Sequence, residues 1–112
     1  MASDCVFCKI VKGEILSKKV YEDDKILAFH DINPAADVHI ILIPKKHIDN
    51  LTKINKSHQN LLFGMLKVAD NLSVKLTPKK FRIVFNGGSL LVVQHLHLHL
   101  LGGNLGKNAK WD

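Results

Sequence analysis

Residues 95–100 read His-Leu-His-Leu-His-Leu, and this strict alternation limits the possible fold more than any other stretch of the chain. Successive side chains of a β-strand point to opposite faces of a sheet. The pattern therefore predicts a strand from Val92 to Leu101, ended by Gly102-Gly103, with three leucines on a core and three imidazoles on the opposite face. Imidazoles repeated in this rhythm are more typical of catalysis or metal binding than of a structural role.

Strand geometry restricts what the three histidines can do together. Residues two apart on a strand are about 6.6 Å apart, so His95 and His99 are expected to lie about 13 Å apart. That separation is too large for two ligands of one metal ion. We therefore expect the three histidines to have different roles. At most two neighbouring histidines bind one metal ion, and the remainder face a substrate.

The rest of the chain predicts a single domain, residues 1–112, with an α+β fold. Hydrophobic residues make up 46% of it, and no repeat or linker divides it. Short strands around one long amphipathic helix favour an antiparallel five-stranded sheet on which that helix packs. The expected elements are a short helix at 7–11 stopped at Gly13, a hairpin of strands 20–22 and 26–30, a strand at 38–43, a helix capped by Ser57 and running to Leu76, and strands at 81–85 and 92–101.

Charge and hydropathy restrict the class of partner. The chain has 16 Lys and Arg against 10 Asp and Glu, a net charge of +6, which favours anionic ligands. The basic residues are scattered and the aromatic residues do not alternate with them, so small phosphorylated substrates fit better than nucleic acid. No stretch approaches the roughly 20 apolar residues of a membrane span, and residues 1–5 lack the features of a signal peptide. We expect a soluble, cytoplasmic protein without a membrane partner.

Cys5 and Cys8 form a C-x-x-C pair near the start of the chain. Two cysteines at this spacing supply half of a tetrahedral zinc site, and the seven histidines of the chain offer the other two ligands. The alternative is a pair of small buried apolar residues. A disulfide is disfavoured in a reducing compartment.

Two polar residues at the ends of expected strands have two interpretations each. Asp31 can accept hydrogen bonds from sugar hydroxyls, or it can form the turn before Asn33-Pro34. Asn86 precedes two glycines, which suit a turn or a close approach of backbone to a ligand. His39 falls within an expected strand and His47 in the loop after it, whereas His30 and His58 read as surface residues.

The motifs together resemble those of the histidine triad (HIT) family, in the branch of small nucleoside phosphoramidate hydrolases. The resemblance rests on the stretch from His95 to Gly103, and it covers nearly the whole chain in the family's order. The other matching stretches are Cys5-Val6-Phe7-Cys8-Lys9-Ile10, Tyr21-Glu22-Asp23, Ala28-Phe29-His30-Asp31-Ile32-Asn33-Pro34 and residues 39–47 with Ile43-Pro44-Lys45-Lys46-His47.

The resemblance implies a homodimer in which two sheets join, with one site per subunit for a purine nucleotide or a nucleoside phosphoramidate. By motif position, His97 is the nucleophile that attacks the α-phosphorus and carries a nucleotidyl intermediate. His99 contacts the phosphate, and His39 orients His97 through a hydrogen bond. The implied nucleotide-binding residues are Phe29 and Ile32 at the base, Asp31 at the ribose, and Asn86 at the phosphate or ribose, together with His97 and His99.

The resemblance also completes the metal site. Members with this C-x-x-C resemble zinc binders in which His47 and His95 join Cys5 and Cys8. The zinc is expected to be structural and to hold the N-terminus in place. This assignment leaves His97 and His99 for chemistry.

The chain departs from the family pattern just before the triad. Members usually carry Gly-Gln-Ser or a similar stretch there, whereas this chain has Leu90, Leu91 and Val92, and so lacks the hydroxyl that would serve a leaving amine. The leading hypothesis is an enzyme that hydrolyses purine nucleoside 5′-phosphoramidates or related nucleotidyl conjugates. The altered segment also motivates an alternative, a nucleotide-binding or regulatory module with little turnover. A third possibility is a purely structural zinc protein.

Overall fold

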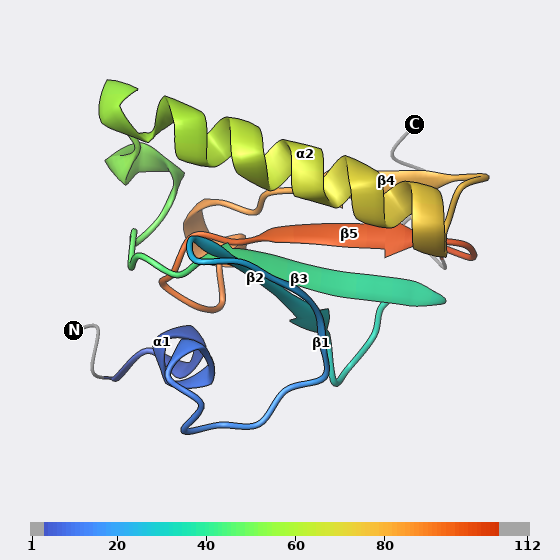
Figure 1. Cartoon of the computed structure of the whole chain (residues 1–112), viewed down its shortest axis with the longest axis horizontal. Coiled ribbons are helices and arrows are strands. Elements are labelled where there is room, and N and C mark those ends of the chain that lie inside the picture. The colour runs from blue at the N-terminus through green and yellow to red at the C-terminus, as the bar shows by residue number, and fades with distance from the viewer. Residues whose placement is uncertain (1–3, 106–112) are drawn as a thin grey trace.

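The computed structural model describes residues 4–105 as an α+β fold with one antiparallel sheet. Figure 1 shows this sheet between a long helix and a short one. The five strands lie in the order β1-β2-β3-β5-β4. Their bounds are Lys19–Glu22 (β1), Ile26–His30 (β2), Val38–Pro44 (β3), Phe81–Val84 (β4) and Leu98–Gly102 (β5), and the helices are Val6–Val11 (α1) and Gln59–Leu76 (α2), with short 3-10 turns at Leu51–Lys53, Lys56–His58 and Gly88–Leu90.

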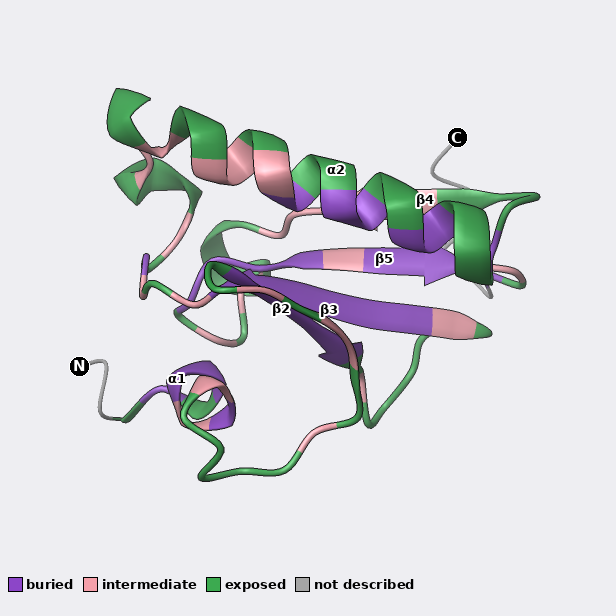
Figure 2. Cartoon of the chain, viewed as in Figure 1, coloured by how far each residue is buried: buried purple, intermediate pink, exposed green. Residues whose placement is uncertain are grey.

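The central strands are buried on both faces, because each face packs on a different helix. Helix α2 covers a core that includes Met65 together with Leu98 and Leu100 of β5. On the opposite face, Phe7 of α1 packs with Phe29 of β2 and Ile41 of β3. Figure 2 shows the buried residues on the faces of the helices that meet the sheet. This arrangement, with a helix on each face of the sheet, explains why β2 and β3 read as nearly continuous apolar runs.

The expected strand from Val92 to Leu101 is wrong at its start, since β5 begins only at Leu98. Its partner strand β3 ends at Pro44, which has no N–H to continue the pairing. The Leu96 N–H bonds instead to the carbonyl of Ile48, at 2.6 Å. His95 and His97 therefore lie in the irregular segment that leads into the strand.

The separation of faces that the alternation predicts is nevertheless confirmed. Leu96, Leu98 and Leu100 all belong to the core under α2. On the other side, the rings of His95 and His97 lie edge-on to Phe7 of α1, with centroids 5.9 and 5.1 Å from its ring. The alternation survives outside the strand because apolar packing, rather than sheet pairing, sorts these side chains.

The start of the long helix also differs from the expectation that Ser57 caps it. The α2 helix itself has His58 at its N-cap position, without a side-chain cap. Asn55 caps the turn before it, and its side chain accepts a hydrogen bond from the Ser57 N–H at 2.9 Å. The ring of His58 returns the bond by accepting the Asn55 N–H at 3.1 Å. A 3-10 turn at Lys56–His58 therefore precedes α2, and the residue that caps this turn lies two positions before Ser57. No helix described within residues 4–105 is long and apolar enough to cross a membrane.

Gly102, at the end of β5, packs closely against the loop after α2. We therefore expect a larger residue at this position to lower the stability of the fold. A Cβ added there would overlap the side chain of Thr77. Gly102→Ala should lower the free energy of unfolding by about 1–3 kcal/mol, as overpacking does. Gly87→Ala is the matched control, since a Cβ at Gly87 meets nothing within 4 Å. Urea unfolding of both variants checks this, and equal midpoints would contradict the close packing.

Candidate active site

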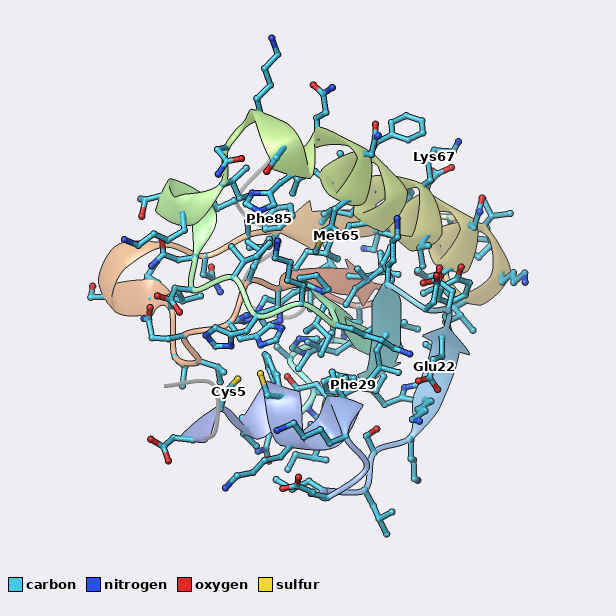
Figure 3. All side chains as sticks on the ribbon, turned by 60° about the vertical axis from the view of Figure 1, so that its left-hand side comes forward. Cys5, Glu22, Phe29, Met65, Lys67 and Phe85 are labelled. Atoms are coloured by element: carbon cyan, nitrogen blue, oxygen red, sulfur yellow. The ribbon has the colours of Figure 1, made fainter. Side chains whose placement is uncertain are left out.

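Four thiol and imidazole side chains from three parts of the chain meet beside the start of α1. Cys5 caps this helix and Cys8 lies in its first turn, while His47 follows β3 and His95 precedes β5. Figure 3 shows Cys5 at the end of α1 with its sulfur directed toward the sheet. The ligand atoms of all four residues lie within 4.8 Å of one another. Cys5 and Cys8 are free thiols.

The distances within this cluster fit a tetrahedral zinc site. Sγ of Cys5 and of Cys8 lie 3.3 and 3.2 Å from Nδ1 of His95 and His47, respectively. The two Nδ1 atoms are 3.2 Å apart. Zinc bonds of about 2.0–2.1 Å to nitrogen and about 2.3 Å to sulfur give tetrahedral edges of about 3.3–3.8 Å. The four residues can therefore hold a metal ion with little movement.

The outer nitrogens of both histidines support this assignment. Nε2 of His95 lies 2.8 Å from the carbonyl oxygen of Pro44, and Nε2 of His47 lies 2.8 Å from a carboxylate oxygen of Asp49. Both partners only accept hydrogen bonds, so each Nε2 carries the hydrogen and each Nδ1 presents a lone pair to the cluster. Burial, followed by the hydrogen bond and charge of Cys5, raises the pKa of Cys8 to about 11. A bound cation would favour the thiolate instead.

His97 also packs edge-on against Phe7 and is almost completely buried. Its Nδ1 is 2.7 Å from the backbone carbonyl oxygen of His95. Because a carbonyl only accepts, Nδ1 carries the hydrogen and Nε2 keeps a lone pair. Burial also lowers the pKa of His97, so the ring is neutral near pH 7. His97 thus presents an oriented basic nitrogen.

His39 and His99 form a second hydrogen-bonded unit. Nδ1 of His39 accepts the N–H of Ala35 at 2.9 Å, so the hydrogen of the neutral ring is at Nε2. That Nε2 is 2.8 Å from Nδ1 of His99 and donates to it. The hydrogen of His99 is then at its own Nε2, which can donate to a ligand. Burial, followed by repulsion from the neighbouring histidines, lowers the pKa of His99 to about 4.

The expectation that His39 orients His97 is therefore wrong. Both ring nitrogens of His39 are engaged, one with Ala35 and the other with His99. The carbonyl of His95 orients His97 instead. His97 lies just before the start of β5, and its ring bonds to the backbone of the same segment.

Asp31, His39 and His99 also bring ligand atoms within 4.8 Å of one another. Coordination through Nε2 of His39 would require the hydrogen to move to Nδ1, where it would face the N–H of Ala35 at 2.9 Å. The backbone amide thus disfavours a metal at this cluster. In the Cys5 cluster, by contrast, hydrogen-bond acceptors lie behind both histidines.

A cavity of about 500 Å³ opens between α1, the end of β2 and the segment before the triad. It brings together all six residues that the sequence assigns to nucleotide binding: Phe29, Asp31, Ile32, Asn86, His97 and His99. Figure 3 shows Phe29 between α1 and the sheet. His39 lies behind the cavity, where it supports His99.

Sequence reasoning missed several residues that line the cavity. Val6, Phe7 and Ile10 of α1 form one wall, and Leu90, Val92 and Val93 lie on the segment before the triad. His30, expected as an ordinary surface residue, is exposed but also lines the cavity. The apolar spacing within 6–10 was the available signal for the α1 wall, since a six-residue helix must place that face against something.

Comparison with known proteins agrees with this architecture. Residues 4–110 match the family model described as scavenger mRNA decapping enzyme C-term binding. The chain is 43% identical to Protein HitA of Neisseria gonorrhoeae over 103 residues, which cover 88% of this chain and 95% of that protein.

The chain is also similar to solved protein structures. The HIT family hydrolase from Legionella pneumophila Philadelphia 1 superposes with a TM-score of 0.87 at 44% identity, covering 90% of this chain and 94% of that one. The HIT family hydrolase from Clostridium thermocellum gives a TM-score of 0.85 at 45% identity, covering 89% and 90%. Similarity over almost the full length of each relative, together with the matching family model, shows that the chain belongs to the histidine triad (HIT) family.

Proposed function

We propose that this protein is a hydrolase of purine nucleoside 5′-phosphoramidates or related nucleotidyl conjugates, acting through a nucleotidyl group carried on His97. The observation that carries the proposal is the fixed tautomer of His97, whose Nε2 keeps a lone pair on a residue that lines the cavity. The names of the hydrolases from Legionella pneumophila and Clostridium thermocellum support a hydrolytic reaction.

The reaction takes two steps. In the first, Nε2 of His97 attacks the α-phosphorus, the bond to the leaving group breaks, and the departing nitrogen takes a proton from solvent. The carbonyl of His95 stabilises the positive charge that develops on the ring, because it accepts the hydrogen of Nδ1. In the second step, water attacks the phosphorus and loses a proton to solvent, the electrons of the P–N bond return to Nε2, and the nucleoside 5′-monophosphate leaves.

His99 and His39 each have the same role in both steps. The Nε2–H of His99 donates to a phosphate oxygen, where negative charge accumulates. His39 is a positioning residue, since its hydrogen bond to Nδ1 keeps that donor in place. Because both rings are neutral near pH 7, they orient and stabilise rather than supply protons.

The nucleoside binds at the end of β2. Asp31 accepts the N–H of Asn33 at 2.8 Å through one oxygen, while the other lies 3.4 Å from Nε2 of His39. This fixed carboxylate suits the ribose hydroxyls. Phe29 and Ile32 provide apolar contact for the base, and Asn86 reaches the phosphate or ribose from the loop after β4.

Zinc at Cys5, Cys8, His47 and His95 has a structural role in this proposal. A tetrahedral ion with four protein ligands has no open position for a substrate. These residues would attach α1, one wall of the cavity, to the segment that carries His97.

We further propose a cytoplasmic homodimer in which the sheet extends across two subunits. Strand β4 lies at one edge of the sheet, and Phe81 at its start is exposed. On the outer side of α2, Phe63 is 66% and Val74 is 65% exposed. An open edge beside exposed apolar residues is a suitable surface for a second copy. Sedimentation equilibrium measures the mass directly, and a monomer at micromolar concentration would contradict this part.

The proposed mechanism predicts a covalent adduct. Mixing the enzyme with an adenosine 5′-phosphoramidate and quenching within the first turnover should yield a nucleotidyl group on His97, identified by peptide mass analysis under conditions that preserve the P–N bond. Turnover without an adduct on any histidine would exclude the covalent route. An adduct on His99 instead would reverse the assigned roles.

The apolar segment Leu90-Leu91-Val92 favours one alternative, a nucleotide-binding module with little turnover. Calorimetry with AMP and a turnover assay on the same preparation separate the two functions. Tight binding without product supports the module, whereas repeated turnover excludes it.

A further inference from the structure

Cys5 and Cys8 are the only cysteines in the sequence, and they lie close enough to react with each other. Cys5 is the N-cap residue of α1, and its sulfur accepts the N–H of Cys8 at 3.3 Å. The two sulfurs lie 3.3 and 3.5 Å from the same atom, Nδ1 of His95, and within 4.8 Å of each other. A disulfide needs sulfurs about 2.05 Å apart, so it can form here by a local movement of one helical turn.

A second cavity gives one of these sulfurs a route to solvent. This cavity, of about 340 Å³, lies beside the metal cluster and is lined by Cys5 and His47 but not by Cys8. Asp4 and Asp49 also line it, and both are exposed, so the cavity opens at the surface. A small molecule that enters it meets the sulfur of Cys5 before that of Cys8.

The charge of this second cavity restricts the molecule that can react there. Its acidic lining residues are Asp4 and Asp49, and no lysine or arginine of residues 4–105 lines it. Carboxylates at the opening repel an anionic oxidant such as glutathione disulfide, but they do not repel neutral hydrogen peroxide. An accessible cysteine with a second cysteine beside it is also the usual arrangement at peroxide-sensitive sites. The geometry thus favours a small, neutral peroxide.

We propose that Cys5 and Cys8 are a peroxide-reactive pair, and that their oxidation to a disulfide releases zinc and weakens the attachment of α1 to the cavity around His97. The inference rests on the proposed zinc site, because bound zinc keeps both sulfurs as thiolates.

The oxidation takes two steps. The sulfur of Cys5 attacks one oxygen of hydrogen peroxide, the O–O bond breaks, and hydroxide leaves as Cys5 becomes a sulfenic acid. The sulfur of Cys8 then attacks the sulfur of Cys5 and displaces a second hydroxide. Two electrons pass from the sulfurs to the peroxide, and two protons from solvent convert the hydroxides to water.

The disulfide has consequences for the cavity wall. Sulfurs joined in a disulfide are no longer thiolate ligands, so only His47 and His95 remain for the metal. Figure 1 shows that α1 continues into β1 through an extended loop. Phe7, between the two cysteines in sequence, contacts the rings of His97 and Phe29, with centroids 5.1 and 5.8 Å away. A shift of α1 therefore alters the wall of the cavity and the packing of the proposed nucleophile.

Oxidation of the zinc-loaded protein tests the inference. A slight molar excess of hydrogen peroxide should release about one zinc ion per chain, the capacity of a single four-ligand site, as measured with a zinc-binding dye. Peptide mass analysis should find Cys5 linked to Cys8, with the mass of the chain lower by two hydrogen atoms. Electrophoresis without reductant should show no linkage between chains. Dithiothreitol followed by zinc should restore the original state.

The binding of AMP measures the effect on the cavity. Calorimetry should show that the Kd for AMP rises by about fivefold or more after oxidation, a typical size for coupling between two sites. Reduction and zinc should return the Kd to its original value. The matched control is Lys12→Ser, at an exposed residue that ends α1 and supplies no atom to the cluster; it should lose zinc and AMP affinity on oxidation as the unmodified protein does.

Dimedone, which traps sulfenic acids, identifies the sulfur that reacts first. A brief exposure of the unmodified protein to peroxide with dimedone should label Cys5 and leave Cys8 unlabelled. Cys8→His and Cys5→His form a matched pair, because each keeps one sulfur and replaces the other with a nitrogen ligand. The first variant should accumulate dimedone on Cys5, whereas the second should be labelled far more slowly, since its remaining sulfur does not line the second cavity.

Each part of the inference has a result that would overturn it. Zinc retained in the presence of peroxide, or a disulfide that joins two chains, would refute the reactive pair. Labelling of Cys8 in preference to Cys5 would refute the route through the second cavity. An unchanged Kd for AMP after oxidation would refute the link to α1. A protein that takes up no zinc would refute the metal site and this inference together, whereas failure to label His97 with a nucleotide would refute only the proposed reaction.

Discussion

Substitution of His97 by glutamine is expected to lower the turnover of a nucleotidyl substrate by about 10⁴-fold or more, as loss of a nucleophile does in enzymes with a covalent intermediate. Glutamine retains much of the bulk that packs on Phe7 but lacks the nucleophilic ring nitrogen. Steady-state assays with an adenosine phosphoramidate measure the loss. Binding of AMP, measured by calorimetry, should change far less than turnover.

His58→Gln is the control for this experiment. His58 ends the 3-10 turn before α2, where its ring accepts the N–H of Asn55, and it does not line the cavity described around His97. Its substitution makes the same chemical change without touching the proposed nucleophile, so turnover should stay near that of the unmodified protein. If His97→Gln retains most of the activity, His97 is not the nucleophile and the proposed mechanism is wrong.

The second large effect is expected from the double substitution Cys5→Ser/Cys8→Ser. It should remove bound zinc and lower the free energy of unfolding by about 4 kcal/mol or more, a size typical of the loss of a structural metal. Elemental analysis of the purified protein and urea unfolding measure the two quantities. Zinc affinity should also weaken as pH falls, because protons compete with the metal for the cysteine sulfurs and the imidazole nitrogens.

Lys12→Ser is the control for the metal experiment. Lys12 ends α1 and is exposed, and it supplies no atom to the metal cluster. Its substitution should leave zinc content unchanged and stability nearly so. Equal zinc in the double variant and in the unmodified protein would refute the four-ligand assignment.

The alternation at 95–100 predicted which side chains face the core, but not where the strand begins. The leucines and histidines separate because apolar residues must be buried, and the sequence shows this directly. The strand boundary depends on Pro44 in a partner strand and on the carbonyl of Ile48, which lie about fifty residues earlier. Local pattern carries no information about such partners.

The hydrogen bonds of His39 also depend on partners that the local sequence does not identify. Its place near the triad follows from the family resemblance, yet its partner depends on which ring nitrogen carries the hydrogen. The backbone N–H of Ala35 decides that, and a backbone amide is present at every residue other than proline. The apolar walls from α1 and from Leu90 to Val93 were likewise beyond local reasoning, since they meet only in the folded chain.

The position of His95, whose carbonyl accepts the bond from Nδ1 of His97, has a consequence for the order in which parts of the molecule fold. His95 also meets Cys5, 90 residues away along the chain. Contacts at such separation close a long loop and therefore form late in folding. During synthesis, Cys5 emerges 90 residues before His95 and must wait for it. The cluster of Cys5, Cys8, His47 and His95 can therefore be completed only after the segment that leads into β5 has been made.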